Sequence, residues 1–205
     1  VLHLELNAKI KEMQQENPFA GLPVPGGEIR KIGLMQLKQS TEHAKTDDKI
    51  KGIYIDGSQP MAGFSTIQQI PQSIIDFRES GKWVVAYNEV MSEGAYYLSS
   101  AAHDVYLNPH GEIESNGLTV SIGFYKKLFD KWQVRPQIFR VGEFKSAVEP
   151  FLLEKMSPEN ELQLTELANG VYDHILTRIS EVRNIERQRL EEISDQMLVR
   201  NAEST

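Results

Sequence analysis

Short hydrophobic runs alternate with amphipathic segments through the first half of the sequence, and this alternation constrains the fold more than any other feature. The run at 50–57 is rich in β-branched residues and ends in a Gly turn, and residues 83–87 form a second continuous apolar run. Continuous apolar strands are typical of parallel sheets that are covered on both faces. Between the two runs, apolar residues recur at helical spacing, namely Ile67, Ile70, Ile74 and Phe77. The sequence therefore predicts an α/β fold with a parallel or mixed sheet flanked by helices.

The same reasoning assigns the other elements. Further strands are expected at 1–6, 104–107 and 136–141, and further helices at 29–45, 94–102, 119–132 and 186–197. Ser65 is expected to cap the helix before residue 81, and Pro71 predicts a kink or a late start of that helix. The stretch at 17–27 is rich in Pro and Gly and is expected to be a loop.

A long helix is predicted over residues 157–184, near the end of the chain. Ser157 is a good cap, and Pro158 suits the first helical position. Its apolar residues repeat at helical spacing: Leu164, Ala168, Val171, Ile175, Ile179 and Val182. A stripe of this length suits packing against another domain or subunit, or against the helix's own sheet.

Composition narrows the possible partners and cofactors. The 205 residues include 40% hydrophobic ones, enough for a buried core, so we expect one large α/β domain over residues 1–205 in preference to two small ones. A net charge of −7 without a Lys/Arg cluster argues against nucleic acid. The chain has no cysteine, and its five histidines lack the paired spacing of metal ligands, so we expect no metal and no cofactor.

The start of the chain suggests a larger parent protein. The sequence begins at Val1, within a strand pattern and without Met, and no run reaches the roughly 18 apolar residues that a membrane-spanning helix needs. We therefore expect this chain to be a piece of a longer protein, whose N-terminal anchor would lie outside it.

One lysine is a candidate catalytic residue. Lys145 follows the predicted strand at 136–141 and is surrounded in the sequence by the apolar residues Phe144, Ala147, Val148 and Phe151. A lysine held in apolar surroundings loses hydration of its ammonium group, so its pKa falls and it can act as a general base. Most lysines near apolar residues nevertheless lay only their stems on the surface. Local chemistry alone leaves both roles open.

The segment Gly142-Glu143-Phe144-Lys145-Ser146-Ala147-Val148-Glu149-Pro150-Phe151 closely resembles the lysine segment of the signal peptide peptidase A (protease IV) family, peptidase family S49. The resemblance extends from about Asp48 to about Arg183. In the long form of that family, two homologous crotonase-like halves supply the lysine (N-terminal half) and the serine (C-terminal half) of a Ser–Lys dyad. The resemblance implies a crotonase/ClpP-like fold with Lys145 as general base. The nucleophilic serine would then lie in a C-terminal half beyond this chain, which alone should be inactive.

The segment Ser92-Glu93-Gly94-Ala95-Tyr96-Tyr97 resembles the serine segment of the same family, in a degenerate form. It follows a strand and opens a helix, where backbone N–H groups point outward and can stabilise an oxyanion. Counting back from Asn108-Pro109 places Glu93, and not Ser92, at the nucleophile position. We therefore expect Ser92 not to be the nucleophile.

The resemblance also implies substrates, partners and a location. Substrates would be cleaved signal peptides and other unfolded segments at the periplasmic face of a bacterial inner membrane. The partners would be the C-terminal half of the same protein and further copies in a homo-oligomer. Two alternatives stay open: an acyl-CoA hydratase or isomerase of the crotonase type, which a Lys145 pointing into solvent would favour, and a non-catalytic oligomerisation module. The acyl-CoA alternative leaves the lysine segment unexplained, and the non-catalytic alternative predicts that Lys145→Ala leaves the complete protein fully active.

Overall fold

The computed structural model describes residues 1–13, 31–139 and 145–204. The chain divides into two compact units, and the division falls within a long helix. We call residues 1–117 together with 175–205 the sheet unit, and residues 118–174 the lysine unit.

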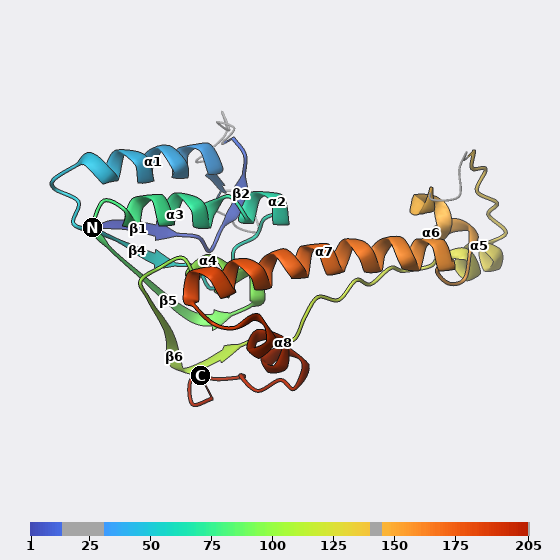
Figure 1. Cartoon of the computed structure of the whole chain (residues 1–205). Helices are drawn as coiled ribbons and strands as arrows, with labels where there is room; N and C mark the ends of the chain where they lie inside the picture. The colour runs from blue at the N-terminus through green and yellow to red at the C-terminus, as the bar shows by residue number, and fades with distance from the viewer. Residues whose placement is uncertain (14–30, 140–144, 205) are drawn as a thin grey trace. The chain divides into compact units, whose positions relative to one another are not determined.

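A parallel sheet lies at the centre of the sheet unit (Figure 1). Its four strands follow the order β1-β4-β5-β6, with bounds Leu2–Glu5, Gly52–Asp56, Trp83–Met91 and Asp104–Ile113. Every neighbouring pair is parallel. Two shorter strands, β2 (Lys9–Lys11) and β3 (Lys31–Gly33), form a separate parallel pair.

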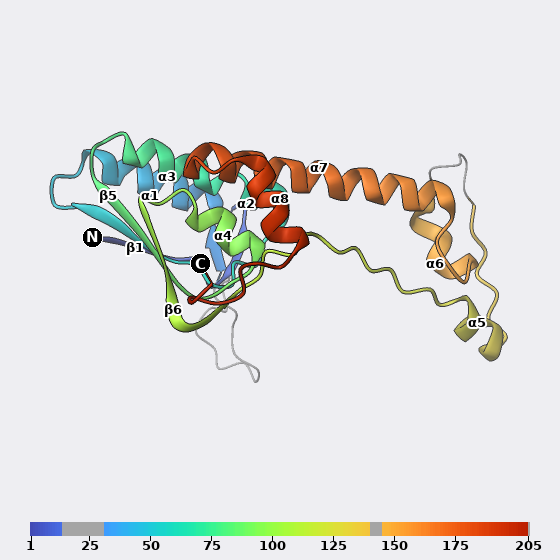
Figure 2. The same ribbon diagram turned by 60° about the horizontal axis from the view of Figure 1, so that its bottom comes forward.

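Helices connect the strands and cover the sheet. They are α1 (Leu34–Thr46), α2 (Phe64–Ile67), α3 (Ile70–Arg78), α4 (Glu93–Ser99) and α8 (Arg187–Asp195). Figures 1 and 2 show α1 and α3 side by side over one face of the sheet. The core between them consists of fully buried apolar side chains, including Ile53, Ile55, Ile70, Ile74, Phe77 and Val84.

The lysine unit has a different interior. It contains α5 (Lys126–Trp132), the short 3-10 helix η1 (Ser146–Val148), α6 (Glu149–Leu152) and the first part of α7 (Pro158–Arg183). Among its described residues only two side chains are buried, and both are polar: Glu149 and Asn160. The apolar side chains among these described residues are partly or largely exposed, so the described part of the unit has no apolar core of the usual kind.

The predicted fold class is confirmed. The structure has an α/β arrangement with a parallel sheet, flanking helices and a long helix towards the C-terminus. Pro71 causes the late start that we expected, because a first short helix, α2, ends before α3 begins with the proline in its first turn. No helix in the described ranges is both long enough and apolar enough to cross a lipid bilayer.

Several predicted boundaries in the sheet unit are wrong. Ser65 does not cap the helix, because α2 already begins at Phe64, after Gly63. The helix expected at 29–45 begins only at Leu34, because residues 31–33 pair with β2. The loop expected at 17–27 lies outside the described residues.

The strand predicted to end at residue 107 continues through Asn108-Pro109 to Ile113. Proline cannot donate a ladder hydrogen bond, and the pairing of β5 with β6 shifts register between Asn88 and Val90, which accommodates it.

The lysine unit departs furthest from the predictions. Residues 119–125 are not helical, and α5 begins only at Lys126. The backbone N–H of Tyr125 donates to the carbonyl of Pro150, so the chain there makes a tertiary contact in place of a helical one. The described part of the strand predicted at 136–141, residues 136–139, forms no strand. Its last two residues lie outside the described ranges.

Candidate functional site

Lys145 lies directly before η1, and its side chain is exposed. The apolar surroundings expected from the sequence are therefore not formed by the described residues: Ala147 is also exposed and Phe151 keeps 40% of its surface. Phe144 lies outside the described ranges. Any water exclusion around this amine would have to come from groups other than the described residues of this chain.

The segment that carries Lys145 is anchored by Glu149, whose side chain is only 2% exposed. One carboxylate oxygen of Glu149 accepts a hydrogen bond from the hydroxyl of Ser157 at 2.6 Å. The other accepts from the backbone N–H of Ser157 at 3.2 Å and from the amide of Asn160 at 2.9 Å. The oxygen of Ser157 in turn accepts from the backbone N–H of Asn160 at 3.2 Å, which confirms Ser157 as the cap of α7.

The same segment also contacts α5. The ring of Phe151 stacks on those of Tyr125 and Phe129, with centroids 6.3 and 6.2 Å apart. The carbonyl of Pro150 accepts from the N–H of Tyr125 at 2.7 Å. Lys145 is thus followed by a short helical segment that is held by α5 on one side and by the start of α7 on the other.

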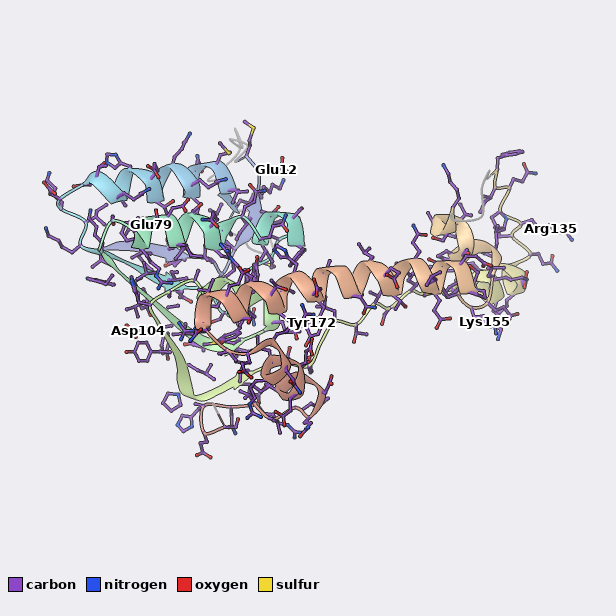
Figure 3. The ribbon with its side chains drawn as sticks, viewed as in Figure 1. Glu12, Glu79, Asp104, Arg135, Lys155 and Tyr172 are labelled. Carbon is purple, nitrogen blue, oxygen red and sulfur yellow. The ribbon has the colours of Figure 1, made fainter. Side chains whose placement is uncertain are left out.

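The turn between α6 and α7 carries a second lysine, Lys155, which is exposed (Figure 3). A neighbouring carboxylate in the same turn, Glu154, forms an exposed ion pair with Lys127 at 3.1 Å. Exposed pairs of this kind contribute little to stability. Glu154 and Lys155 therefore offer matched controls for Glu149 and Lys145.

The start of α4 is the second candidate position, and it belongs to the sheet unit. Ser92 is the cap of α4, and its hydroxyl oxygen accepts from the N–H of Ala95 at 3.3 Å. Glu93 is half-buried and accepts from the N–H of Gly117 at 2.8 Å. The hydroxyl of Ser92 therefore acts as a helix cap.

Burial raises the pKa of the Glu93 carboxyl, and the nearby charge of Glu114 adds to the effect. Hydrogen bonds from the backbone of Gly117 and Asn116 oppose it, but burial prevails. This carboxyl fixes the chain at Gly117, the last residue before the lysine unit.

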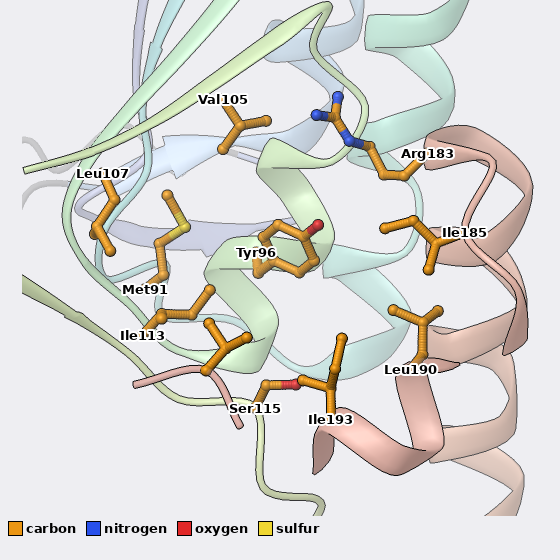
Figure 4. A pocket seen from close by; sticks show the side chains of 11 residues that line it. Met91, Tyr96, Val105, Leu107, Ile113, Ser115, Arg183, Ile185, Leu190 and Ile193 are labelled. Carbon is orange, nitrogen blue, oxygen red and sulfur yellow. The ribbon is translucent and has the colours of Figure 1, made fainter. Parts of the chain in front are cut away.

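A mainly apolar pocket of about 270 Å³ lies beside α4 in the sheet unit (Figure 4). Its lining comes from β5, β6, α4 and the C-terminal segment: Met91, Tyr96, Val105, Leu107, Ile113, Ser115, Arg183, Ile185, Leu190, Ile193 and Val199. Burial raises the pKa of Tyr96, and the guanidinium of Arg183 partly offsets this. Arg183 also donates to the carbonyls of Ala102 and His103, so it fastens the end of α7 to the sheet unit.

Sequence reasoning did not find the hydrogen bonds of Glu149 or those of Arg183. Both are tertiary contacts, and no spacing in the sequence predicts them. Both carboxylate oxygens of Glu149, which flanks Lys145 in the sequence, are engaged by the start of α7. Glu143, the other flanking carboxylate, lies outside the described residues. In the ranges 1–13, 31–139 and 145–204, no cluster of three or more His, Asp or Glu side chains could hold a metal ion.

Comparison with known proteins identifies the family. The model of peptidase family S49 matches residues 76–203, which is more than half of the chain and includes both candidate positions. The chain therefore belongs to peptidase family S49.

Curated relatives agree with this assignment. Protease 4 of Haemophilus influenzae is 36% identical over 162 residues, covering 78% of this chain and 26% of that protein. Protease 4 of Salmonella typhi is 33% identical over 168 residues, covering 79% and 26%. A chloroplastic serine protease SPPA of Arabidopsis thaliana is 27% identical over 196 residues, covering 96% and 28%. The chain thus spans about a quarter of the length of these relatives.

Solved structures also resemble the chain. A membrane-bound stomatin-specific protease aligns with a TM-score of 0.45 at 13% identity, covering 83% of this chain and 67% of that one. An enoyl-CoA hydratase/isomerase family protein from Silicibacter pomeroyi aligns with a TM-score of 0.34 at 11% identity, covering 80% and 84%.

Proposed function

We propose that this chain is the lysine-bearing N-terminal half of an envelope serine peptidase with a Ser–Lys dyad, in which Lys145 is the general base. The observation that carries the proposal is the lysine segment at 142–151, together with membership of family S49. Family membership also favours a peptidase over the acyl-CoA alternative. The exposure of Lys145 in this chain alone would suit either enzyme.

In the proposed mechanism, the neutral amine of Lys145 takes the proton of a serine hydroxyl while that oxygen attacks the peptide carbonyl. The resulting ammonium then gives the proton to the leaving amine, and the acyl-enzyme is hydrolysed by water. Backbone N–H groups beside the serine stabilise the tetrahedral oxyanion. The serine and these donors come from the C-terminal half of the protein, so this chain alone does not hydrolyse peptides.

The exposure of Lys145 fits a dyad that is completed by another part of the protein. A neutral lysine requires a site from which water is excluded, and the described residues of this chain leave the side chain open. Docking of the serine-bearing half would cover the amine and bring the hydroxyl to it. The exposed apolar side chains of the lysine unit, such as Trp132 and Leu162, suit burial in such a contact.

We further propose that the substrates are cleaved signal peptides and other unfolded segments, and that the protein is a membrane-anchored homo-oligomer facing the periplasm of a bacterial inner membrane. The names of the relatives, Protease 4 and serine protease SPPA, support a peptide substrate. The apolar surface of the lysine unit supports assembly with other subunits.

The test is hydrolysis of an unfolded protein by the full-length protein, with Lys145→Ala compared with Lys155→Ala. Loss of a general base lowers the rate by about a hundredfold or more. We expect Lys145→Ala to lose at least this much while it folds and assembles normally, and Lys155→Ala to keep the wild-type rate. Wild-type activity in Lys145→Ala would show that Lys145 is not the general base, and it would favour the non-catalytic alternative for this chain.

A further inference from the structure

The buried side chains in the described part of the lysine unit belong to a polar cluster around the start of α7, formed by Glu149, Ser157 and Asn160. Glu149 and Asn160 are each 2% exposed, and they are the only buried side chains among the described residues of this unit. Protein interiors rarely hold a carboxylate unless hydrogen bonds compensate for its lost hydration. Here three donors converge on its two oxygens at 2.6–3.2 Å.

The cluster connects two helical parts of the chain that differ in length and therefore in helix stability. The first is the short segment 145–152, whose helices η1 and α6 have three and four residues and would not be stable alone. The second is α7, which has 26 residues and continues into the core of the sheet unit through Ile175 and Ile179. The bonds of Glu149 therefore fix a weak element to a strong one.

Lys145 lies four residues before Glu149, at the cap position of η1, and its side chain meets no described residue that would fix it. The segment has other supports, among them the carbonyl of Pro150, which accepts from the N–H of Tyr125 at 2.7 Å. The hydroxyl of Ser146 lies 3.5 Å from the side-chain oxygen of Gln163, at the outer limit of a hydrogen bond, and the stacked ring of Phe151 is six residues away. Of the side chains in 145–152, Glu149 makes the most hydrogen bonds to the start of α7 and is thus the main side-chain connection between the lysine segment and that helix.

We infer that Glu149 is a positioning residue for Lys145: its buried carboxylate fastens the lysine segment to the start of α7 and thereby sets where the amine meets the serine. This inference rests on the proposed role of Lys145 as the base. General bases act only when they lie within hydrogen-bond reach of the proton they remove, so a small displacement of the backbone is costly to the rate.

The experiment measures kcat and KM against pH for the full-length protein with an unfolded protein substrate. The variants are Glu149→Ala, which removes the acceptor, and Glu149→Gln, which keeps the size and one acceptor oxygen. Glu154→Gln is the matched control, because it removes a carboxylate from the adjoining exposed turn. Lys145→Ala is measured alongside.

We expect Glu149→Ala to lower kcat at neutral pH by at least about thirtyfold and to leave KM within about twofold, as for a displaced general base. A loosened segment leaves the amine longer in water, where its protonated form is favoured, so the rise of kcat with pH should move upward by at least about half a unit. Glu149→Gln should recover part of the rate, and Glu154→Gln should match wild type.

Two results would overturn the inference. One is wild-type kcat and pH dependence in Glu149→Ala. The other is a loss that is equal at every pH, which is what a smaller folded fraction would produce; Glu149→Gln supplies the same comparison if Glu149→Ala does not fold. An active Lys145→Ala variant would refute the proposed function itself. An inactive Lys145→Ala beside a fully active Glu149→Ala would refute only the positioning role.

Discussion

Ser157 makes the structure of the lysine unit directly testable, because a single hydroxyl serves two purposes there. Its oxygen caps α7 by accepting from the N–H of Asn160, and its hydrogen is donated to Glu149 at 2.6 Å. The substitution Ser157→Ala removes both interactions and leaves one oxygen of a buried carboxylate without this donor. Ser157→Thr keeps the hydroxyl and is the control.

The expected loss can be estimated from the two interactions. Removing a helix cap costs about 1 kcal/mol. Losing a hydrogen bond to a charged group costs roughly 1.5–3 kcal/mol. The sum, about 2.5–4 kcal/mol, is an upper limit because both losses come from one side chain. Even half of it corresponds to an increase of about tenfold in the open population, since about 1.4 kcal/mol is a factor of ten.

Hydrogen exchange followed by mass spectrometry is the appropriate assay, because it reports local opening of one segment where a melting temperature reports the whole protein. In the full-length protein, we expect the peptides that cover η1, α6 and the first turn of α7 to exchange at least about tenfold faster in Ser157→Ala. Peptides from the sheet unit should be unaffected, and Ser157→Thr should resemble wild type. Unchanged exchange in Ser157→Ala would refute the claim that this cluster holds the segment.

Three further predictions concern stability. Burial raises the folded-state pKa of Glu93, so the contribution of this carboxyl to folding stability is present below the unfolded pKa and is lost as pH rises through the folded pKa. Glu93→Gln should therefore raise the melting temperature at pH 7 and not near pH 4. An equal change of the melting temperature at both pH values would contradict the reasoning. A Cβ on Gly111 would lie 2.3 Å from the carbonyl oxygen of Glu89, so Gly111→Ala should destabilise the protein by at least about 2 kcal/mol in a denaturant titration. Gly170 lies inside α7 with open space around its Cα, and Gly170→Ala should stabilise that helix by up to about 1 kcal/mol, seen as slower hydrogen exchange.

The elements that sequence predicted well are those whose apolar residues are buried within this chain. The strands predicted at 50–57 and 83–87 form as β4 and β5, and their apolar residues, such as Ile53 and Val84, are fully buried in the parallel sheet. The long helix was predicted from its cap at Ser157 and from a stripe whose later members, Ile175 and Ile179, are buried. In these cases the spacing of apolar residues in the sequence matches the face of the element that is buried in the structure.

The elements of the lysine unit were predicted less well because their apolar residues are not buried among the described residues. Its apolar residues, including Leu128, Trp132 and Val134, remain exposed among the described residues, so their spacing does not report packing within this chain. A helix at 119–132 and a strand at 136–141 were inferred from that spacing. The helix forms only at 126–132, and the described part of the strand, residues 136–139, does not form. The candidate site divides in a similar way. Lys145 is a candidate because the segment 142–151 resembles the lysine segment of the family. The hydrogen bonds from Glu149 to the start of α7 are tertiary contacts that no sequence pattern predicts.

The most direct measurement of the central claim restores an amine at position 145 by chemistry. This chain has no cysteine, so in Lys145→Cys the introduced thiol is the only one that it offers to 2-bromoethylamine, which converts it into a thioether analogue of lysine. We predict that full-length Lys145→Cys is inactive, that aminoethylation restores peptide hydrolysis, and that the restored activity rises at a lower pH than in wild type, because the sulfur makes the amine less basic. Wild-type activity in Lys145→Cys before alkylation, or restored activity with an unshifted pH profile, would contradict the assignment of Lys145 as the base.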